Sequence, residues 1–317
     1  MPILGHRQSS QSPAVPGAAG KAIIAIHRAE LPSHELCYGN NSFISSAEQT
    51  PLDTMPLNFG LNGQRVLVTA SSSGIGYGAA EAFLKEGARV VINSSDAEKL
   101  SAAHATLATL GEVYAVVADL TSKKDLERLV RESVSNLGGI DALVYVTGSP
   151  KPGRFLDFSY EDWRAASDLL VVSPAYLAKL VADHMIQTGT AGRMVFLSSY
   201  VIKEPLLTLA LSSVCRVAVL SLVRTLGREL GPKKIRVNGI MPGYIRTGRI
   251  DQLAQDAAKK RGIKPEDWIK EVENEIPIGR IGSPEELANA ILFLSSELSS
   301  YVSGATIPVD GAILRSI

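Results

Sequence analysis

The chain has few cysteines, no net charge and no long uninterrupted apolar run, and each lack excludes a class of protein. Its 317 residues hold only two cysteines, Cys37 and Cys215, too few for a disulfide framework or a four-thiolate zinc site. The 32 basic and 32 acidic residues cancel, which argues against holding nucleic acid or an anionic membrane by bulk charge. No apolar run approaches the roughly 18 residues of a membrane span. We therefore expect a cytoplasmic protein that acts on small molecules, with no nucleic-acid or membrane partner.

The first 54 residues differ in composition from the rest of the chain. They hold five of the 16 prolines and three of the five histidines, and they show no sustained helical or strand period. His6, His27 and His34 are too widely spaced to indicate a metal site, so we expect no metal. The early basic residues and the serines also fit an organelle-targeting peptide, although the arginine pattern is thin. We expect residues 1–54 to be an extension, disordered or absent from the mature protein, and residues 55–317 to form one domain.

Short apolar runs alternate with longer helical patterns beyond residue 64. The runs predict strands, and the stretches between them predict helices. The strands are expected at 65–69, 89–93, 113–117, 142–146, 193–197, 236–240 and 306–309, and the helices at 75–86, 97–110, 123–137, 161–187, 210–230 and 284–294. Apolar strands separated by helices require a parallel sheet that is covered on both faces. The sequence therefore predicts a single α/β domain with a doubly wound, mostly parallel Rossmann sheet, and a lid over residues 244–282.

A glycine-rich turn, TASSSGIG at 69–76, joins the first predicted strand to the first predicted helix. Glycines in such a turn let the backbone approach a pyrophosphate, whose charge is stabilised at the helix N-terminus. A glycine-rich turn alone is a weak signal. The strand before it, the helix after it and a second strand at 89–93 together predict a dinucleotide-binding site.

Several motifs in this order resemble the short-chain dehydrogenase/reductase family, in particular a divergent subgroup similar to 3-oxoacyl-acyl-carrier-protein reductases. The turn is similar to the family's TGxxxGIG, with Ala70 in place of its first glycine, and VADL, RVNGIMPGYIRT and the stretch 277–312 resemble later segments. The resemblance implies a homodimer or homotetramer. It also implies cofactor contacts by Thr69, Ser71, Ser73, Gly74, Ile75, Gly76, Ser94, Ser95, Asp119, Leu120, Gly148, Arg216, Pro242, Gly243, Ile245 and Thr247.

The choice between NADP and NAD depends on the end of the second predicted strand. Ser94 stands where a carboxylate would bind the ribose 2′-hydroxyl of NAD and repel the 2′-phosphate of NADP. Asp96 follows closely, but an aspartate there is typical of a helix N-cap. The sequence therefore favours NADP over NAD, although no arginine follows Ser94 and Ser73 stands where NADP-preferring relatives often carry a basic residue.

The reaction centre that the resemblance implies is altered at three of its four positions. The family's Asn, Ser, Tyr and Lys correspond to Leu170, Ser199, Ser212 and Arg216. Ser212 is a far weaker acid than tyrosine, although its hydroxyl can still donate a hydrogen bond. Arg216, one helical turn further on the same face, can grip ribose hydroxyls but does not relay a proton. The candidate catalytic residues are therefore Ser199, Ser212 and Arg216, with Lys203 as a further candidate.

Other side chains near the expected site could replace the missing acid. Lys203 could turn toward the substrate carbonyl, but a solvated lysine is the simpler interpretation. Tyr200 follows Ser199 in the same segment, Tyr244 could be only a wall of the pocket, and Tyr145 could pack in the core. Cys215 is expected to be a buried small side chain rather than a reactive thiol.

Three functions remain open from the sequence. The first is an NAD(P)-dependent oxidoreductase that reduces a carbonyl or oxidises a secondary alcohol. The second is a regulatory or scaffold protein that binds the dinucleotide without redox chemistry, and the third is a dehydratase or isomerase on the same fold. Ser199 and the PGYIRT loop favour the first, whereas the altered reaction centre favours the second.

Overall fold

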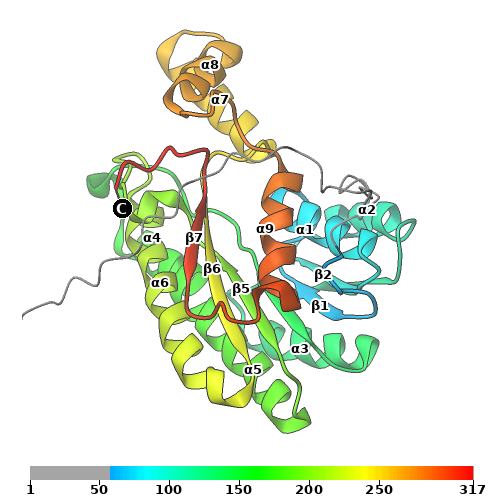
Figure 1. The fold of residues 1–317 in the computed structure, drawn as a ribbon. Coiled ribbons are helices and arrows are strands. Elements are labelled where there is room, and N and C mark those ends of the chain that lie inside the picture. Colours follow the sequence, from blue (N-terminus) through cyan, green and yellow to red (C-terminus); the bar gives the residue numbers. More distant parts are fainter. Residues whose placement is uncertain (1–57, 317) are drawn as a thin grey trace, which may run out of the picture. The chain divides into compact units, whose positions relative to one another are not determined.

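Seven short parallel strands form the sheet that the alternating sequence predicts (Figure 1). The computed structural model describes residues 58–316, so the expected extension 1–54 lies outside the described residues and stays a prediction. The strands lie in the order β3-β2-β1-β4-β5-β6-β7, and the order reverses between β1 and β4. Their bounds are β1 (Arg65–Val68), β2 (Arg89–Ser94), β3 (Val113–Val117), β4 (Ala142–Tyr145), β5 (Arg193–Leu197), β6 (Arg236–Pro242) and β7 (Thr306–Val309).

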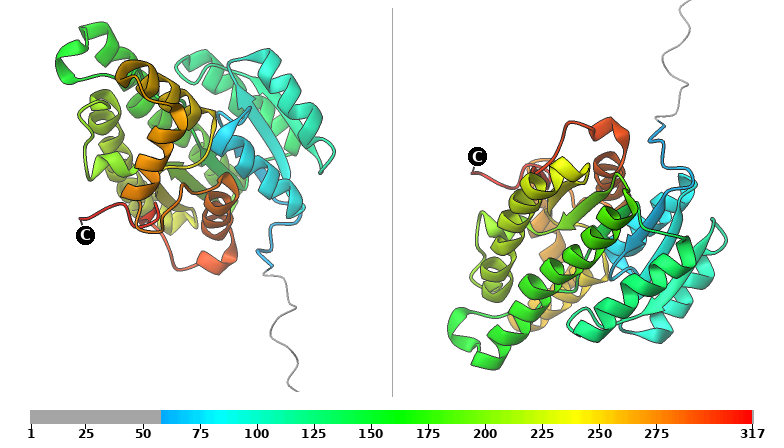
Figure 2. Two further views of the ribbon diagram at one scale, coloured as in Figure 1. Left: turned by 90° about the horizontal axis from the view of Figure 1, so that it is seen from above. Right: turned by 90° about the horizontal axis from the view of Figure 1, so that it is seen from below.

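Helices cover both faces of the sheet, because neighbouring residues of each strand point to opposite faces. Val66 and Val68 of β1 pack with one helical layer, and Leu67 packs with the other. The first layer holds α1 (Gly74–Lys85), α2 (Ala97–Leu107) and α9 (Pro284–Ser295). The second holds α3 (Lys123–Leu137), α5 (Ser173–Thr188) and α6 (Ala210–Leu230), as Figure 2 shows from two sides. The doubly wound α/β fold is thereby confirmed.

The helix predicted over 161–187 is interrupted. It consists of α4 (Tyr160–Ser167), one π-helical turn (Asp168–Val172) and α5. A π turn widens the helix and lets a backbone carbonyl bond outside it. The Leu169 carbonyl lies 3.2 Å from the hydroxyl of Tyr145, at the end of β4. The contact between Leu169 and Tyr145, which are distant in sequence, therefore accompanies the interruption. The apolar pattern of the sequence did not reveal this interruption.

The expected lid contains two helices, α7 (Gly248–Arg261) and α8 (Pro265–Glu275). Figure 1 shows them beyond the end of the sheet at which β6 ends. They have a small core of their own, built around Ile250, Val272 and Ile276. The lid is thus a packed helical hairpin rather than an irregular loop.

Two helical stretches in the described part of the chain, Tyr160–Thr188 and Ala210–Lys233, are long and apolar enough to cross a membrane by length and composition. The sequence did not predict these stretches, because polar residues interrupt their apolar runs. Leu177 of α5 and Val223 of α6 are fully buried in the core against the sheet. A core helix passes the same test, so these stretches are weak evidence for a membrane span.

Gly227 of α6 provides a test of how closely this helix packs against the loop that precedes β7. A Cβ atom at this position would lie 2.7 Å from the backbone of Gly304. We expect Gly227→Ala to lower the free energy of unfolding by about 1–3 kcal/mol, because the clash outweighs the better helix propensity of alanine. Gly231→Ala is the matched control, since a Cβ atom there would have nothing within 4 Å. Urea unfolding measures both, and equal stability of Gly227→Ala and the wild type would contradict the packing.

Candidate active site

A cleft of about 940 Å³ opens at the ends of the strands, beside the point where the strand order reverses. The loops that follow β1 to β6 form its walls, together with the start of α7. Doubly wound sheets bind their ligands at this position, because the loops diverge there. The sequence-predicted site residues that line it are Ser73, Gly74, Ile75, Gly76, Ser94, Ser95, Asp119, Leu120, Gly148, Ser199, Ser212, Arg216, Pro242, Gly243, Ile245 and Thr247.

The turn between β1 and α1 fits a pyrophosphate. Gly74 has a φ of +60°, and a Cβ atom on Gly76 would lie 2.5 Å from the Ala70 carbonyl oxygen. Ser73 is the N-cap of α1, but its side chain makes no capping hydrogen bond. Among the described residues, the N–H groups of the first helical turn therefore have no side-chain acceptor, and the positive end of the helix faces the cleft. Both features suit the dinucleotide that the sequence predicts.

Ala70 has a φ of +44°, a conformation that favours glycine. Its N–H group donates to Oδ1 of Asn93 over 3.3 Å. The Asn93 side chain is fully buried and donates from Nδ2 to the carbonyls of Val116 and Ala118. Asn93 thereby ties the turn after β1 to the end of β3. Sequence reasoning missed Asn93, although an asparagine inside an apolar strand is the signal for such a role.

Three predicted site residues do not line the cleft. Thr69 and Ser71 are fully buried behind the cleft wall. The Thr69 hydroxyl bonds the Val146 backbone, and the Ser71 hydroxyl donates to the Val68 carbonyl over 2.8 Å, so both are used within the protein. Lys203 lies at the end of the short turn after β5 and does not line the cleft.

Two serines line the end of the cleft next to β2 and β3. The hydroxyls of Ser72 and Ser94 lie 3.1 Å apart. Asp96 is the N-cap of α2, where it accepts from the Lys99 backbone N–H and pairs with the Lys99 ammonium at 2.9 Å. Lys99 lines the cleft, which sequence reasoning missed. A lysine in the first turn of a helix opposes the helix dipole and was the available signal.

At the opposite end of the cleft, Arg216 forms hydrogen bonds within its own helix α6 and to the loop after β4. Its Nε–H group donates to the Ser212 hydroxyl over 3.1 Å, and another N–H donates to the Gly148 carbonyl over 3.1 Å. The side chain is buried, with 7% of its surface exposed. No carboxylate within residues 58–316 forms an ion pair with it. Burial lowers the pKa of Arg216 to about 10, so the guanidinium stays charged at neutral pH.

The position to which the resemblance assigns the family's asparagine is apolar in space as well as in sequence. Leu170 is buried against Leu211 and Cys215. The carbonyl of the neighbouring Leu169, in the π turn, lies within hydrogen-bond distance of the Tyr145 hydroxyl. Burial raises the pKa of Tyr145 to about 12. Tyr145 is therefore a packing residue, and the polar side chains that line this side of the cleft are Thr147 and Ser149, from the loop after β4.

Two tyrosines form an aromatic wall of the cleft. The ring centres of Tyr200 and Tyr244 lie 5.6 Å apart, and Trp268 of the lid packs edge-on against Tyr244. Burial raises the pKa of both tyrosines. Burial also raises the pKa of Cys215, which lies outside the cleft lining. Neither tyrosine is therefore poised to ionise near neutral pH.

Comparisons with known proteins show which family the chain belongs to. A family model described as enoyl-(acyl carrier protein) reductase matches residues 69–312. The dehydrogenase/reductase SDR family member 4 of Bos taurus is 36% identical over 259 residues, which cover 81% of this chain and 89% of the relative. The chain belongs to the short-chain dehydrogenase/reductase family. Membership confirms the predicted family and the enzyme class, an NAD(P)-dependent oxidoreductase.

Two further relatives in the short-chain dehydrogenase/reductase family show the range of its members. The 7alpha-hydroxysteroid dehydrogenase of Escherichia coli strain K12 is 34% identical over 261 residues, 82% of this chain and 98% of the relative. The crystal structure of L-sorbose reductase from Gluconobacter frateurii, complexed with NADPH and L-sorbose, has a TM-score of 0.79 and 31% sequence identity. The match covers 82% of this chain and all of that structure.

The left-handed backbone at Ala70 predicts a gain on substitution. We expect Ala70→Gly to raise the free energy of unfolding by up to about 1 kcal/mol, because the left-handed penalty of alanine exceeds the entropy cost of glycine. Ala312→Gly is the control, since Ala312 also has a positive φ but does not line the cleft. Urea unfolding of both variants is the measurement. A loss of stability in Ala70→Gly would show that the turn does not need this conformation.

Proposed function

We propose that this chain reduces a carbonyl or oxidises a secondary alcohol, and that Ser212 and Arg216 replace the usual tyrosine and lysine. The hydrogen bond from Arg216 Nε to Ser212 Oγ carries the proposal. Because Arg216 donates, the Ser212 oxygen accepts, and the hydroxyl hydrogen of Ser212 remains free for another acceptor. Ser199 lines the same end of the cleft, and its oxygen accepts weakly from the Val201 N–H, over 3.4 Å.

The two serine hydroxyls are suited to hold a substrate oxygen. In the reduction direction, the bound nicotinamide cofactor supplies the hydride that adds to the carbonyl carbon. Negative charge then develops on the carbonyl oxygen, and donors fixed in place before the reaction stabilise it. Ser199 and Ser212 supply these donors, and the buried charge of Arg216 polarises the Ser212 hydroxyl. Ser212 cannot keep the negative charge itself. As it gives its proton to the alkoxide, it must take one from water, and hydroxide leaves to solvent.

The cofactor is proposed to be NADP rather than NAD. No carboxylate stands at Ser94, and the Asp96 carboxylate is used by α2 and Lys99. The Ser72 and Ser94 hydroxyls and the Lys99 ammonium would hold the 2′-phosphate. Among structural relatives, L-sorbose reductase was crystallised with NADPH and 7α-hydroxysteroid dehydrogenase with NADH, so the comparisons support either cofactor and the preference rests on these side chains.

A homodimer or homotetramer in the cytoplasm is part of the same proposal. Val214 and Val217 leave apolar surface exposed on α6, although α6 also packs on the sheet. Apolar surface of this kind is typical of contacts between copies of a protein. Light scattering of the purified protein measures the assembly.

The proposed roles predict how variants behave with a panel of carbonyl substrates. We expect Ser212→Ala to lower kcat by about 100-fold, because one preorganised donor to the developing oxyanion is lost. Arg216→Met should lower kcat at least as much, because Ser212 is no longer polarised. Ser213→Ala is the matched control, since the Ser213 hydroxyl is buried without a partner in the described residues and lies outside the cleft lining. Unchanged kcat in Ser212→Ala would contradict its role.

A double variant separates the enzyme from a regulatory protein. Ser212→Tyr combined with Arg216→Lys restores the family's pair. If the wild type oxidises NADPH with at least one carbonyl of the panel, the altered centre is catalytic. If only the double variant does so, while both bind cofactor equally, the natural chain is a dinucleotide-binding regulatory protein.

Cofactor preference has its own test. We expect Ser94→Asp to weaken NADPH binding by about 100-fold, because two like charges meet at the 2′-position, and to leave NADH binding equal or tighter. Lys99→Ala should weaken only NADPH binding, by about tenfold. Fluorescence titration with each cofactor measures both effects. Equal changes for NADPH and NADH would show that Ser94 and Lys99 do not face the 2′-position.

A further inference from the structure

The cleft carries more positive than negative charge. Lys99, Lys151, Arg216 and Arg249 line it, and the one carboxylate in its lining is Asp119, which follows β3. Lys99 and Lys151 have carboxylate partners outside the lining. Within residues 58–316, Arg216 and Arg249 form no ion pair. Two guanidinium groups in one cleft repel each other, and an anion between them would remove that cost.

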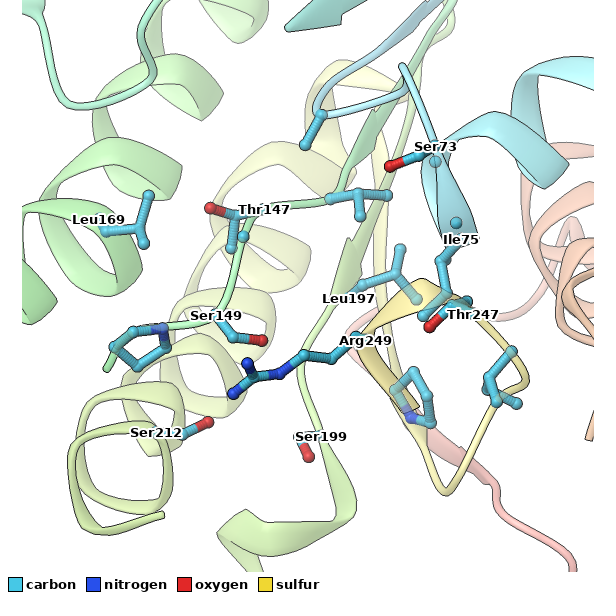
Figure 3. A pocket seen from close by; sticks show the side chains of 18 of the residues that line it. Ser73, Ile75, Thr147, Ser149, Leu169, Leu197, Ser199, Ser212, Thr247 and Arg249 are labelled. Carbon is cyan, nitrogen blue, oxygen red and sulfur yellow. The ribbon is translucent and has the colours of Figure 1, made fainter. Parts of the chain in front are cut away.

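Arg249 extends into the cleft from the first turn of α7. Figure 3 shows its guanidinium on the side of Ser149 and Ser212, away from Ser73 at the pyrophosphate turn. The residue is half-buried, and within the described part of the chain its side chain makes one hydrogen bond, to Gln252 over 3.3 Å. Arg246, three residues earlier, is exposed and pairs with Asp251 at 3.7 Å. Of these two arginines, Arg246 is therefore neutralised by a carboxylate, whereas the donors of Arg249 face the cleft.

We infer that the substrate carries a carboxylate as well as the reacting carbonyl, and that Arg249 binds this carboxylate. The inference rests on the proposed carbonyl chemistry at Ser212. The planar guanidinium matches a carboxylate with two parallel hydrogen bonds, which fixes orientation as well as position. Since Arg249 reaches toward Ser212, an oxo acid held by Arg249 would direct its carbonyl to the serine hydroxyls. The positive charge of Arg216 favours the same anion.

The binding of matched probes tests this inference without turnover. The protein is saturated with NADP⁺, which cannot reduce a ketone, and titrated calorimetrically with 2-oxopentanoate, 4-oxopentanoate and uncharged 2-pentanone. We expect at least one oxo acid to bind about tenfold or more tightly than 2-pentanone. Arg249→Ala should lose about 10–100-fold in affinity for that acid only. Arg249→Lys should lose less, because lysine keeps the positive charge but lacks the paired donors of the guanidinium. Arg246→Ala is the matched control and should bind as the wild type does.

Three results would overturn the inference. One is equal binding of the ketone and both oxo acids by the wild type. Another is a loss of NADPH affinity in Arg249→Ala with acid binding intact, which would place Arg249 at the cofactor phosphates. The third is tighter binding of dihydroxyacetone phosphate than of dihydroxyacetone, while neither oxo acid binds more tightly than 2-pentanone. That result would show that the bound anion is a phosphate. If the wild type binds an oxo acid but oxidises NADPH with no carbonyl, the hydride-transfer proposal fails while the carboxylate site stands.

Discussion

The buried guanidinium of Arg216 is the interaction on which the reaction end of this cleft depends. It joins Ser212 of α6 to Gly148 in the loop after β4. Burial without a carboxylate partner in the described residues lowers the pKa of Arg216 to about 10, yet leaves it charged at neutral pH. That charge orients the Ser212 hydroxyl and makes the cleft attractive to anions. The charge of Arg216 therefore underlies the proposed chemistry and adds to the proposed attraction of an acidic substrate by Arg249.

The positions that the resemblance implies to be replaced form one packed arrangement. Leu170, assigned to the place of an asparagine, makes apolar contacts, and the Tyr145 hydroxyl lies within hydrogen-bond distance of the Leu169 carbonyl. A tyrosine–lysine pair works by lowering the pKa of a phenol near a cation. In the proposed site, Arg216 supplies the cation, and Ser212 takes the place of the phenol and acts as a hydrogen-bond donor without ionising. The proposed site therefore stabilises an oxyanion electrostatically rather than storing a proton.

The sequence predicted the elements that local patterns determine. Apolar runs located all seven strands, and Asp96 was expected and found at the start of α2. The π turn at 168–172 was missed because it accompanies a contact with Tyr145, more than twenty residues earlier in the chain. The sequence also could not show that the Thr69 hydroxyl turns to the Val146 backbone, or that Arg249 and not Arg246 faces the cleft. These orientations depend on tertiary partners, which spacing does not encode.

The pH dependence of kcat tests the central claim most directly. The side chains that line the cleft include no histidine and no cysteine, and burial raises the pKa of Tyr200 and Tyr244. If Ser212 donates without ionising, kcat for carbonyl reduction should change by less than about twofold between about pH 6 and about pH 9. The variant with tyrosine and lysine restored should show a titration in this range. A tenfold change per pH unit in the wild type would reveal an ionising acid and contradict the role of Ser212.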